Sequence, residues 1–202
     1  MKAFTLASAN EHKAREFQAL ADRAELRVVI RSAQAVGGMP FVPEDTGTFV
    51  GNARQKARAL QGLLPEGEWA LADDSGLCVD ELGGLPGVDS AIYAGRPSNA
   101  AANLDKLVHD MRAVPEGMRG AHFKCVLLAA GPDGAERGFI GRCDGRLLPA
   151  PRGRQGFGYD PLFAPAGHDR SFAELGDAVK STLSHRARAW EQFVAWLRDT
   201  ER

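Results

Sequence analysis

Two adjacent carboxylates follow an apolar run near the middle of the chain. Residues 69–72 are apolar and are predicted to form a buried strand, which leads directly into Asp73 and Asp74. Burying two carboxylates is costly unless a cation or hydrogen-bond donors meet them. The carboxyl ends of strands in α/β proteins are also where ligand crevices form. We therefore expect Asp73 and Asp74 to lie at the floor of a cleft and to hold Mg²⁺ against a phosphate chain.

Further acidic and basic side chains suit the same chemistry. Glu44 stands before a predicted helix that carries Lys56 outside its apolar stripe. Lys13 lies in the first turn of a helix predicted to begin after Asn10, where a cation opposes the helix macrodipole. Simpler interpretations remain open, because acidic residues before a helix are often caps and lysines are often solvated. Together, however, these groups would supply carboxylates for Mg²⁺ and cations for phosphates.

The chain has a second group of basic residues close to its last predicted helix. Lys180, His185 and Arg186 lie at or before the first turn of that helix, with Ser184 as its N-cap. Cations there work against the helix dipole, which is easier to explain by an anionic ligand than by stability. An ordinary capping histidine is the alternative for His185.

A glycine-rich loop carries two aromatic residues. Residues 152–161 read RGRQGFGYDP, so Phe157 and Tyr159 are predicted to lie on a loop and not in a strand. Exposed aromatic rings on such a loop can stack on a nucleotide base. Alternatively, the two rings simply attach the loop to the core.

The elements that must position these residues follow a mixed pattern. Strands are predicted at 2–7, 26–31 and 121–131, and a turn at 132–134 leads to a hairpin partner at 138–143. Helical apolar stripes are predicted at Ala14/Phe17/Ala21, at Phe49/Ala53/Ala57/Leu60/Leu64, at Leu104/Leu107/Val108/Met111 and at Ala187/Trp190/Val194/Leu197. Early β–α pairs and a late hairpin indicate an α/β fold with a mixed sheet.

Composition narrows the class of protein. The 202 residues suit one large domain or two small lobes, and a formal net charge of −1 provides no global field for nucleic acid or an anionic membrane. No apolar run approaches the roughly 20 residues that span a bilayer. Three widely separated cysteines, Cys78, Cys125 and Cys143, without CxxC or Cys/His spacing, argue against zinc and disulfides. Reduced, mostly buried thiols in a cytoplasmic protein are expected.

Common nucleotide and hydrolase motifs are absent from the sequence. There is no GxxxxGK[ST], so a P-loop is excluded, and there is no GxGxxG. Ser75 has no GxSxG context and is not predicted to be a hydrolase nucleophile.

In their combination, these segments resemble the inosine triphosphate pyrophosphatase family, the non-standard purine NTP pyrophosphatases. The matching segments are TLASANEHKAREF, EDTGTFVGNARQKARAL, LADDSGLCVDELGGLPGVDSAIYAG, GFGYDP, FAEL and KSTLSHRARA, in order from residue 5 to residue 189. The resemblance implies a single domain over residues 1–202 with an elongated, twisted mixed β-sheet flanked by helices, two lobes and a deep active-site cleft. It also implies a homodimer that hydrolyses ITP, dITP and XTP to the monophosphate and pyrophosphate.

The resemblance assigns roles by matching position. Asp74 is implied as the catalytic proton acceptor for the attacking water, and Glu44 and Asp74 as ligands of Mg²⁺; neighbouring Asp73 could share the role of base or ligand. The implied substrate-binding residues are Ser8, Ala9, Asn10, Glu11, His12, Lys13, Lys56, Ser75, Phe157, Gly158, Tyr159, Asp160, Lys180, His185 and Arg186. Ala9 departs from the family, which usually has glycine there, and a Cβ disfavours positive φ in that loop.

Two other classes of function compete with hydrolysis. A nucleotide-binding or sensor protein would use the same residues without turnover. A nucleic-acid-binding protein would use Arg152 and Arg154 beside Phe157 and Tyr159, although the net charge is against it.

Overall fold

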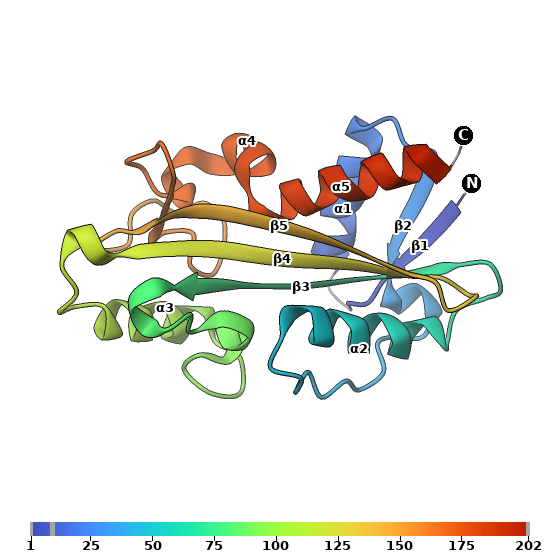
Figure 1. The fold of residues 1–202 in the computed structure, drawn as a ribbon, viewed down its shortest axis with the longest axis horizontal. Coiled ribbons are helices and arrows are strands. Elements are labelled where there is room, and N and C mark those ends of the chain that lie inside the picture. The colour runs from blue at the N-terminus through green and yellow to red at the C-terminus, as the bar shows by residue number, and fades with distance from the viewer. Residues whose placement is uncertain (1, 9–10, 201–202) are drawn as a thin grey trace. The chain divides into compact units, whose positions relative to one another are not determined.

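The computed structural model describes residues 2–8 and 11–200, apart from the side chain of His12. Its strands are β1 (Lys2–Leu6), β2 (Val28–Ser32), β3 (Trp69–Val79), β4 (Gly120–Ala130), β5 (Glu136–Leu147) and β6 (Phe163–Pro165) (Figure 1). Its α-helices are α1 (Glu11–Arg23), α2 (Phe49–Gln61), α3 (Ala100–Asp110), α4 (Phe172–Leu183) and α5 (His185–Thr200). Short 3₁₀ turns, such as that at Ala33–Val36, connect several of them.

The six strands form one mixed sheet in the order β2-β1-β3-β4-β5-β6. β1 pairs in parallel with both β2 and β3, whereas β5 and β6 are antiparallel. The predicted turn joins β4 to β5, closed by a hydrogen bond from the Gly131 N–H to the Ala135 carbonyl at 2.8 Å. The predicted α/β class with a mixed sheet flanked by helices is therefore confirmed.

The chain divides into two compact units. The first comprises the chain as far as Asp74, residues 126–140 and the chain from Ala189 onward. The second comprises residues 75–125 and 141–188. The predicted cleft between lobes stays a prediction.

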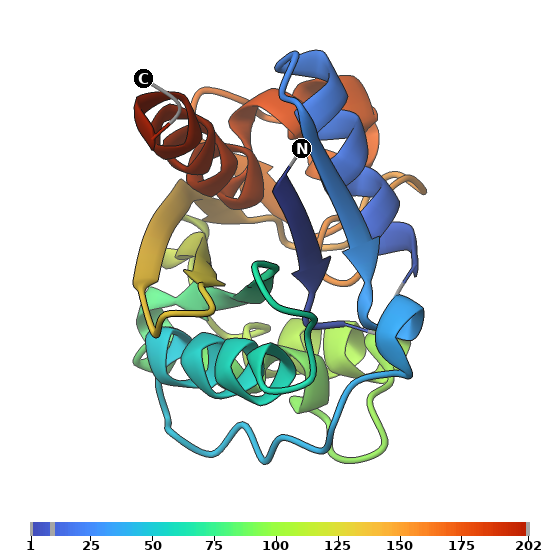
Figure 2. The same ribbon diagram turned by 90° about the vertical axis from the view of Figure 1, so that its right-hand side faces the viewer.

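An aromatic cluster forms the centre of the first unit. The ring of Phe193 in α5 lies 5.2 Å from Phe4, 5.5 Å from Phe139 and 4.8 Å from Trp190, measured between ring centroids. α1 joins the same face, because the ring of Phe17 lies 5.4 Å from Trp190. Figure 2 shows α2 on the opposite side of the strands from α1 and α5. The first unit thus has helices on both faces of its part of the sheet.

The predicted apolar stripes decide which helix faces are buried. Ala14, Phe17 and Ala21 of α1 are buried, as the spacing predicts. In α2 the stripe is buried from Phe49 to Leu60, but the helix ends at Gln61, so Leu64 lies beyond it. Ala187, Trp190, Val194 and Leu197 of α5 are buried too, and Ser184 caps that helix by accepting a hydrogen bond from the Ala187 N–H at 3.2 Å.

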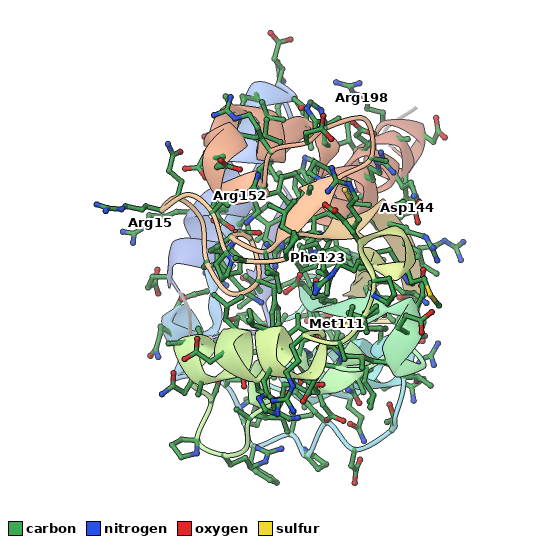
Figure 3. The ribbon with its side chains drawn as sticks, turned by 90° about the vertical axis from the view of Figure 1, so that its left-hand side faces the viewer. Arg15, Met111, Phe123, Asp144, Arg152 and Arg198 are labelled. Atoms are coloured by element: carbon green, nitrogen blue, oxygen red, sulfur yellow. The ribbon has the colours of Figure 1, made fainter. Side chains whose placement is uncertain are left out.

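The second unit has its own hydrophobic core. It is built from β3, β4, β5, α3 and α4 and includes Leu77, Met111, Phe123, Leu147 and Phe172. In Figure 3 Met111 and Phe123 lie in the interior, while Asp144 and Arg152 lie toward the outside. The predicted inward face of α3 packs against this core through Leu104, Leu107 and Val108.

Cys78, Cys125 and Cys143 are free and buried, as expected for reduced structural thiols. Within the described residues, no helix is both long and apolar enough to cross a bilayer.

Candidate functional site

The acidic pair lies inside β3 and not at its end. The prediction of a strand that stops at Ala72 is wrong, because β3 continues through Asp73 and Asp74 to Val79. The sequence could not reveal this, because the strand is held by its neighbour β4 on one side after β1 has ended on the other. β1 stays in register only as far as Leu6 opposite Leu71. The two carboxylates therefore still lie just beyond the carboxyl end of a parallel strand, where ligands commonly bind.

Adjacent residues of a strand point to opposite faces of the sheet, and the acidic pair follows this rule. Asp73 accepts a bond from Lys13 of α1 at 2.6 Å, and Asp74 accepts one from Lys56 of α2 at 2.6 Å. The two carboxylates are 6% and 7% exposed, so each buried charge has a cation within bonding distance. Lys13 is thus paired with Asp73 and is not simply a solvated surface lysine.

Lys56 brings Glu44 and Asp74 together. Its ammonium lies 3.0 Å from Glu44 Oε2 and 2.6 Å from Asp74 Oδ1. Residues thirty positions apart in the sequence therefore converge on one point, as predicted. Asp74 Oδ2 is buried and makes no hydrogen bond among the described residues. Glu44 has φ 51°, a left-handed conformation that is uncommon outside glycine and is often found where function imposes it.

Charge and burial set the protonation of this cluster. Burial raises the pKa of Asp74 above its usual value, the carboxylates of Glu44 and Asp73 add to the rise, and Lys56 opposes it. Burial tends to lower the pKa of Lys56, but its contacts with Asp74 and Glu44 outweigh burial, so the pKa is raised. Lys56 therefore stays charged at neutral pH, beside a carboxylate with increased basicity.

The N-terminal part of the predicted site is only partly described. Ala9 and Asn10 lie outside the described residues, as does the side chain of His12. Glu11 is exposed, and its carboxylate accepts a hydrogen bond from the Ser32 hydroxyl. The carbonyl of Ser8 accepts a bond from the Ala33 N–H at 3.1 Å, which ties the end of β1 to the turn after β2.

A second cluster in the other unit joins several of the remaining predicted residues. Buried Asp160 accepts bonds from the Phe157 N–H at 2.8 Å and from the Lys180 ammonium. The same ammonium lies 4.1 Å from the centre of the Phe157 ring, and the Arg186 guanidinium lies 6.0 Å from it. Phe157 as a residue is 58% exposed. This cluster presents an exposed ring with two cations beside it, which suits a base or an anion.

The other predicted residues of the second unit have different environments, and their proposed contact with substrate stays a prediction. Tyr159 is buried and its hydroxyl donates to the Ser90 carbonyl at 2.8 Å, so its ring attaches the loop to the core. His185 is buried and stacks on Phe123 at 4.9 Å. Lys180 lies in the last turn of α4, where a cation favours the helix dipole, so the argument from an unfavourable dipole is wrong for it. Ser75 and Gly158 are half-buried, in β3 and in the loop respectively.

Sequence reasoning missed the buried amide of Asn52. It lies in α2, is 2% exposed, and accepts hydrogen bonds from the backbone and side chain of Thr46. A polar residue on the helix beside Ala53, within an otherwise apolar stripe, was the available signal. Buried polar groups that bond to a loop commonly fix the shape of that loop.

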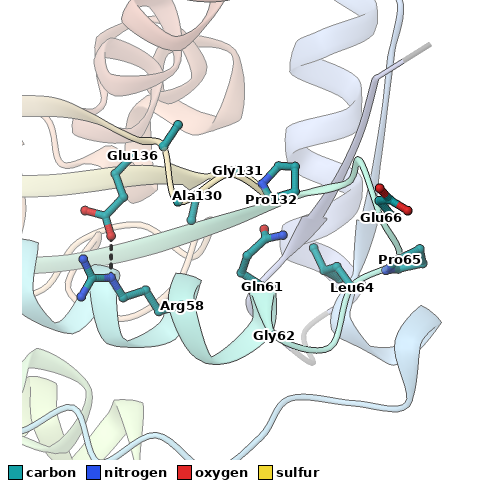
Figure 4. A pocket seen from close by; sticks show the side chains of 12 residues that line it. Arg58, Gln61, Gly62, Leu64, Pro65, Glu66, Ala130, Gly131, Pro132 and Glu136 are labelled. Carbon is teal, nitrogen blue, oxygen red and sulfur yellow. Dashed lines mark hydrogen bonds and ion pairs between the residues drawn. The ribbon is translucent and has the colours of Figure 1, made fainter.

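A separate pocket of about 700 Å³ lies in the first unit. It is formed by the end of α2 and the turn between β4 and β5, and contains the ion pair of Arg58 with Glu136 at 2.6 Å (Figure 4). None of the predicted site residues lines it. We therefore do not assign the candidate site to this pocket.

The carboxylates of Glu44 and Asp74 can be compared with what a metal site requires. Within the described residues, no three His, Cys, Asp or Glu side chains are grouped to hold a metal ion by themselves. Mg²⁺ does not need such a cage, since it is commonly held by one or two carboxylates together with substrate phosphates and water. Two carboxylates match that limited donor set. Asp74 Oδ2 is buried and makes no hydrogen bond among the described residues, and Glu44 lies beside the same lysine, Lys56.

Comparison with known proteins gives one consistent answer. A model of the Ham1 family matches residues 4–196. A dITP/XTP pyrophosphatase of Opitutus terrae is 57% identical over 199 residues, covering 96% of this chain and 97% of that protein. One from Streptomyces avermitilis is 42% identical and covers 98% of both chains.

Solved structures agree with the sequence comparisons. The Ham1 protein of Coxiella burnetii has a TM-score of 0.89 at 35% identity and covers 98% of this chain and 100% of its own. The Ham1 protein of Staphylococcus aureus has a TM-score of 0.87 at 32% identity, with the same coverage. The family resemblance read from the sequence is confirmed.

Proposed function

This chain belongs to the Ham1 family, and we propose that it is a dITP/XTP pyrophosphatase. It hydrolyses non-standard purine nucleoside triphosphates, namely ITP, dITP and XTP, to the monophosphate and pyrophosphate, and so removes them from the nucleotide pool. The observation that carries this proposal is the convergence of Glu44 and Asp74 on the ammonium of Lys56 at 3.0 and 2.6 Å. Two carboxylates for a divalent ion and a cation for phosphate are thereby collected at one point.

Mg²⁺ is the metal that we propose for the site, with Glu44 and Asp74 as its protein ligands. When bound, it would neutralise the triphosphate and the charge that builds on the leaving pyrophosphate. Lys56 stands beside the same carboxylates and would contact phosphate oxygens from the protein side. Lys13, held by Asp73 at 2.6 Å, would add a second ammonium for the phosphates.

Asp74 is the group that we propose as general base. Its Oδ1 is held by Lys56, so Oδ2, which makes no hydrogen bond among the described residues, would serve both as metal ligand and as acceptor of the proton from the attacking water. Ligation of a metal weakens a carboxylate as a base, so the two proposed roles of Asp74 oppose each other. In the metal-free protein burial raises the pKa of Asp74, which makes it a better base than an exposed aspartate, whereas a bound Mg²⁺ would lower that pKa. Asp73 is bonded to Lys13 and points to the other face of the sheet, so its proposed role is to position that lysine.

In the proposed reaction, water attacks the α-phosphorus in line and pyrophosphate leaves. The proton of the water passes to Asp74, the bond from the α-phosphorus to the bridging oxygen breaks, and the electron pair stays on pyrophosphate. Lys56 and Lys13 stabilise the charge that appears on the leaving group.

The second cluster is proposed to bind substrate as well. The exposed ring of Phe157 offers a face for a purine base, and Lys180 and Arg186 lie beside it. Specificity would come from donors to the 6-oxo group of hypoxanthine or xanthine. Adenine carries an amino group at that position, and a buried donor would then lose its partner. Guanine also carries a 6-oxo group, so slow reaction of GTP requires a separate feature that rejects its 2-amino group.

A panel of triphosphates tests the proposed function. With Mg²⁺, we expect ITP, dITP and XTP to give pyrophosphate and no orthophosphate, and ATP and GTP to react far more slowly. Release of orthophosphate would instead indicate a triphosphate phosphatase. Tight binding of ITP without any product would favour a nucleotide sensor, which is the main competing function.

Two further expectations accompany the proposal. We propose that the protein acts as a homodimer, which light scattering on the purified protein would test, since a monomeric mass at working concentration would contradict it. We also propose that it works in the cytoplasm, where the nucleotide pool is located.

A further inference from the structure

The segment that carries Glu44 has little support of its own. Every residue from Pro43 to Thr48 is exposed, and Glu44 has φ 51°. An exposed segment in an unfavourable backbone conformation keeps that conformation only where its surroundings fix it. The position of the Glu44 carboxylate therefore depends on the contacts that this segment makes with the rigid helix α2.

Asn52 provides the buried part of those contacts. Its side-chain oxygen accepts one hydrogen bond from the Thr46 N–H at 3.2 Å and another from the Thr46 hydroxyl at 2.8 Å. The residue is 2% exposed, whereas Thr46 is exposed. The bonds thus join an exposed loop residue to a buried side chain that cannot move without disturbing the core.

A glycine in α2, Gly51, leaves room for the Thr46 side chain to contact the helix. A Cβ atom at Gly51 would lie 2.1 Å from Thr46 Oγ1, so only glycine permits this contact. Thr48 is the N-cap of α2, and its hydroxyl accepts a bond from the Gly51 N–H at 3.0 Å. A glycine inside a helix is unfavourable by itself, which makes its use here informative.

Asn52 and Lys56 are four residues apart in α2 and therefore lie on the same side of the helix. Asn52 holds Thr46, while Lys56 lies 3.0 Å from the carboxylate of Glu44, two residues earlier. One helix face thus fixes both the backbone and the side chain of the same segment.

We propose that Asn52 is a positioning residue for metal binding: acting through Thr46, it holds Glu44 where its carboxylate can share a divalent ion with Asp74. The proposal rests on the proposed function, in that Glu44 and Asp74 are taken as ligands. Asn52 itself touches neither metal nor substrate. Removal of partners that orient a ligand commonly lowers metal affinity by roughly 10- to 100-fold.

Three variants test this role. Asn52→Ala removes the acceptor, Thr46→Val removes the exposed hydroxyl while keeping its shape, and Thr46→Ser keeps the hydroxyl as the matched control. We expect the Mg²⁺ concentration for half-maximal XTP hydrolysis to rise roughly 10-fold or more for the first two and to stay near wild type for the third. At saturating Mg²⁺, turnover should largely recover.

A second measurement needs no turnover. Calorimetric titration of Mn²⁺ into the protein with the α,β-methylene analogue of ITP, which cannot be cleaved, should show weaker Mn²⁺ binding in Asn52→Ala and Thr46→Val. If wild type hydrolyses none of the triphosphates, the proposed function fails, but this titration still decides the role of Asn52.

Asn99→Ala is a control that distinguishes an effect on metal binding from a general loss of stability. Asn99 caps α3 by accepting a bond from the Ala102 N–H at 3.1 Å, so its loss should lower stability without changing metal affinity. The proposal is overturned if Asn52→Ala and Thr46→Val lower only the melting temperature or turnover and leave metal affinity unchanged. Absence of Mn²⁺ binding by wild type would overturn it as well.

Discussion

Asp74 combines a cost to stability with the proposed role in catalysis. The residue is 7% exposed and carries an oxygen without a hydrogen bond among the described residues. Lys56 offsets part of the cost through its 2.6 Å contact, but burial still raises the pKa of Asp74. Such a residue is typical of functional sites, where stability is given up for reactivity.

The raised pKa of Asp74 predicts how the free energy of unfolding depends on pH. Because the pKa of Asp74 is higher in the folded protein than in the unfolded chain, the folded state keeps a proton that the unfolded state has already lost. The contribution of Asp74 to stability therefore falls as the pH rises from about 4 toward the raised pKa. Asp74→Asn lacks this term, so its stability relative to wild type should improve between about pH 4 and pH 7.

Urea unfolding of the metal-free proteins at both pH values measures this difference. For each protein, the free energy of unfolding at one pH is subtracted from that at the other. Effects that do not depend on pH, such as the loss of the Asp74 partner of Lys56, then cancel. An equal difference between variant and wild type at the two pH values would contradict a raised pKa at Asp74. In the same variant, loss of most activity while folded would support the role of base.

At the scale of elements, loops are held by buried polar groups that belong to neighbouring helices. Asn52 of α2 holds Thr46, and Lys180 of α4 bonds to Asp160 of the glycine-rich loop. Asp160 also accepts a hydrogen bond from the Phe157 N–H at 2.8 Å. Each loop thus takes its shape from a helix that is itself fixed by its apolar face.

The Asp160–Lys180 pair should matter more to stability than exposed pairs do. The two side chains are 4% and 14% exposed, so Asp160→Ala would leave a mostly buried ammonium without its carboxylate. We expect a loss of about 3 kcal/mol in the free energy of unfolding. The control is Asp144→Ala, which breaks an exposed pair with Arg142 and should cost about 0–1 kcal/mol. Similar losses in both variants, measured by urea unfolding, would show that burial of the pair is unimportant.

At the scale of the whole molecule, each unit has its own core. Phe193 lies at the centre of the first unit, with 0% exposure and four aromatic neighbours. Phe193→Ala should lower the free energy of unfolding by about 3–5 kcal/mol, because it leaves a cavity among rigid rings. Phe41, which is 91% exposed, supplies the matched control: Phe41→Ala should change stability by less than about 0.5 kcal/mol. A small effect of Phe193→Ala would mean that the cluster repacks.

Periodicity was sufficient to predict most elements but not their ends. Apolar spacing placed α1, α2, α3 and α5, because burial of one helix face is a local pattern. The continuation of β3 through Asp73 and Asp74 depends on pairing with β4, which is distant in the sequence. No local pattern could therefore mark where that strand ends.

The candidate site was predicted to a similar extent. Residue type and family resemblance identified Glu44, Lys56 and Asp74, which the structure brings together. The different environments of Phe157 and Tyr159 were not predictable, since both are aromatic residues of one loop and only tertiary contacts bury the second. Asn52 was missed although its place in an otherwise apolar helix stripe was a signal, because its bonds to Thr46 depend on a loop conformation that the sequence does not specify.

The central claim is that Glu44 and Asp74 share one divalent ion, and electron paramagnetic resonance of bound Mn²⁺ tests it most directly. With the α,β-methylene analogue of ITP present, wild type should bind one Mn²⁺ tightly, and Glu44→Gln and Asp74→Asn should each weaken that binding. Because the ligands act on the same ion, the double variant should lose less than the two single losses combined. Unchanged Mn²⁺ binding in either single variant, or fully independent effects in the double variant, would contradict the account.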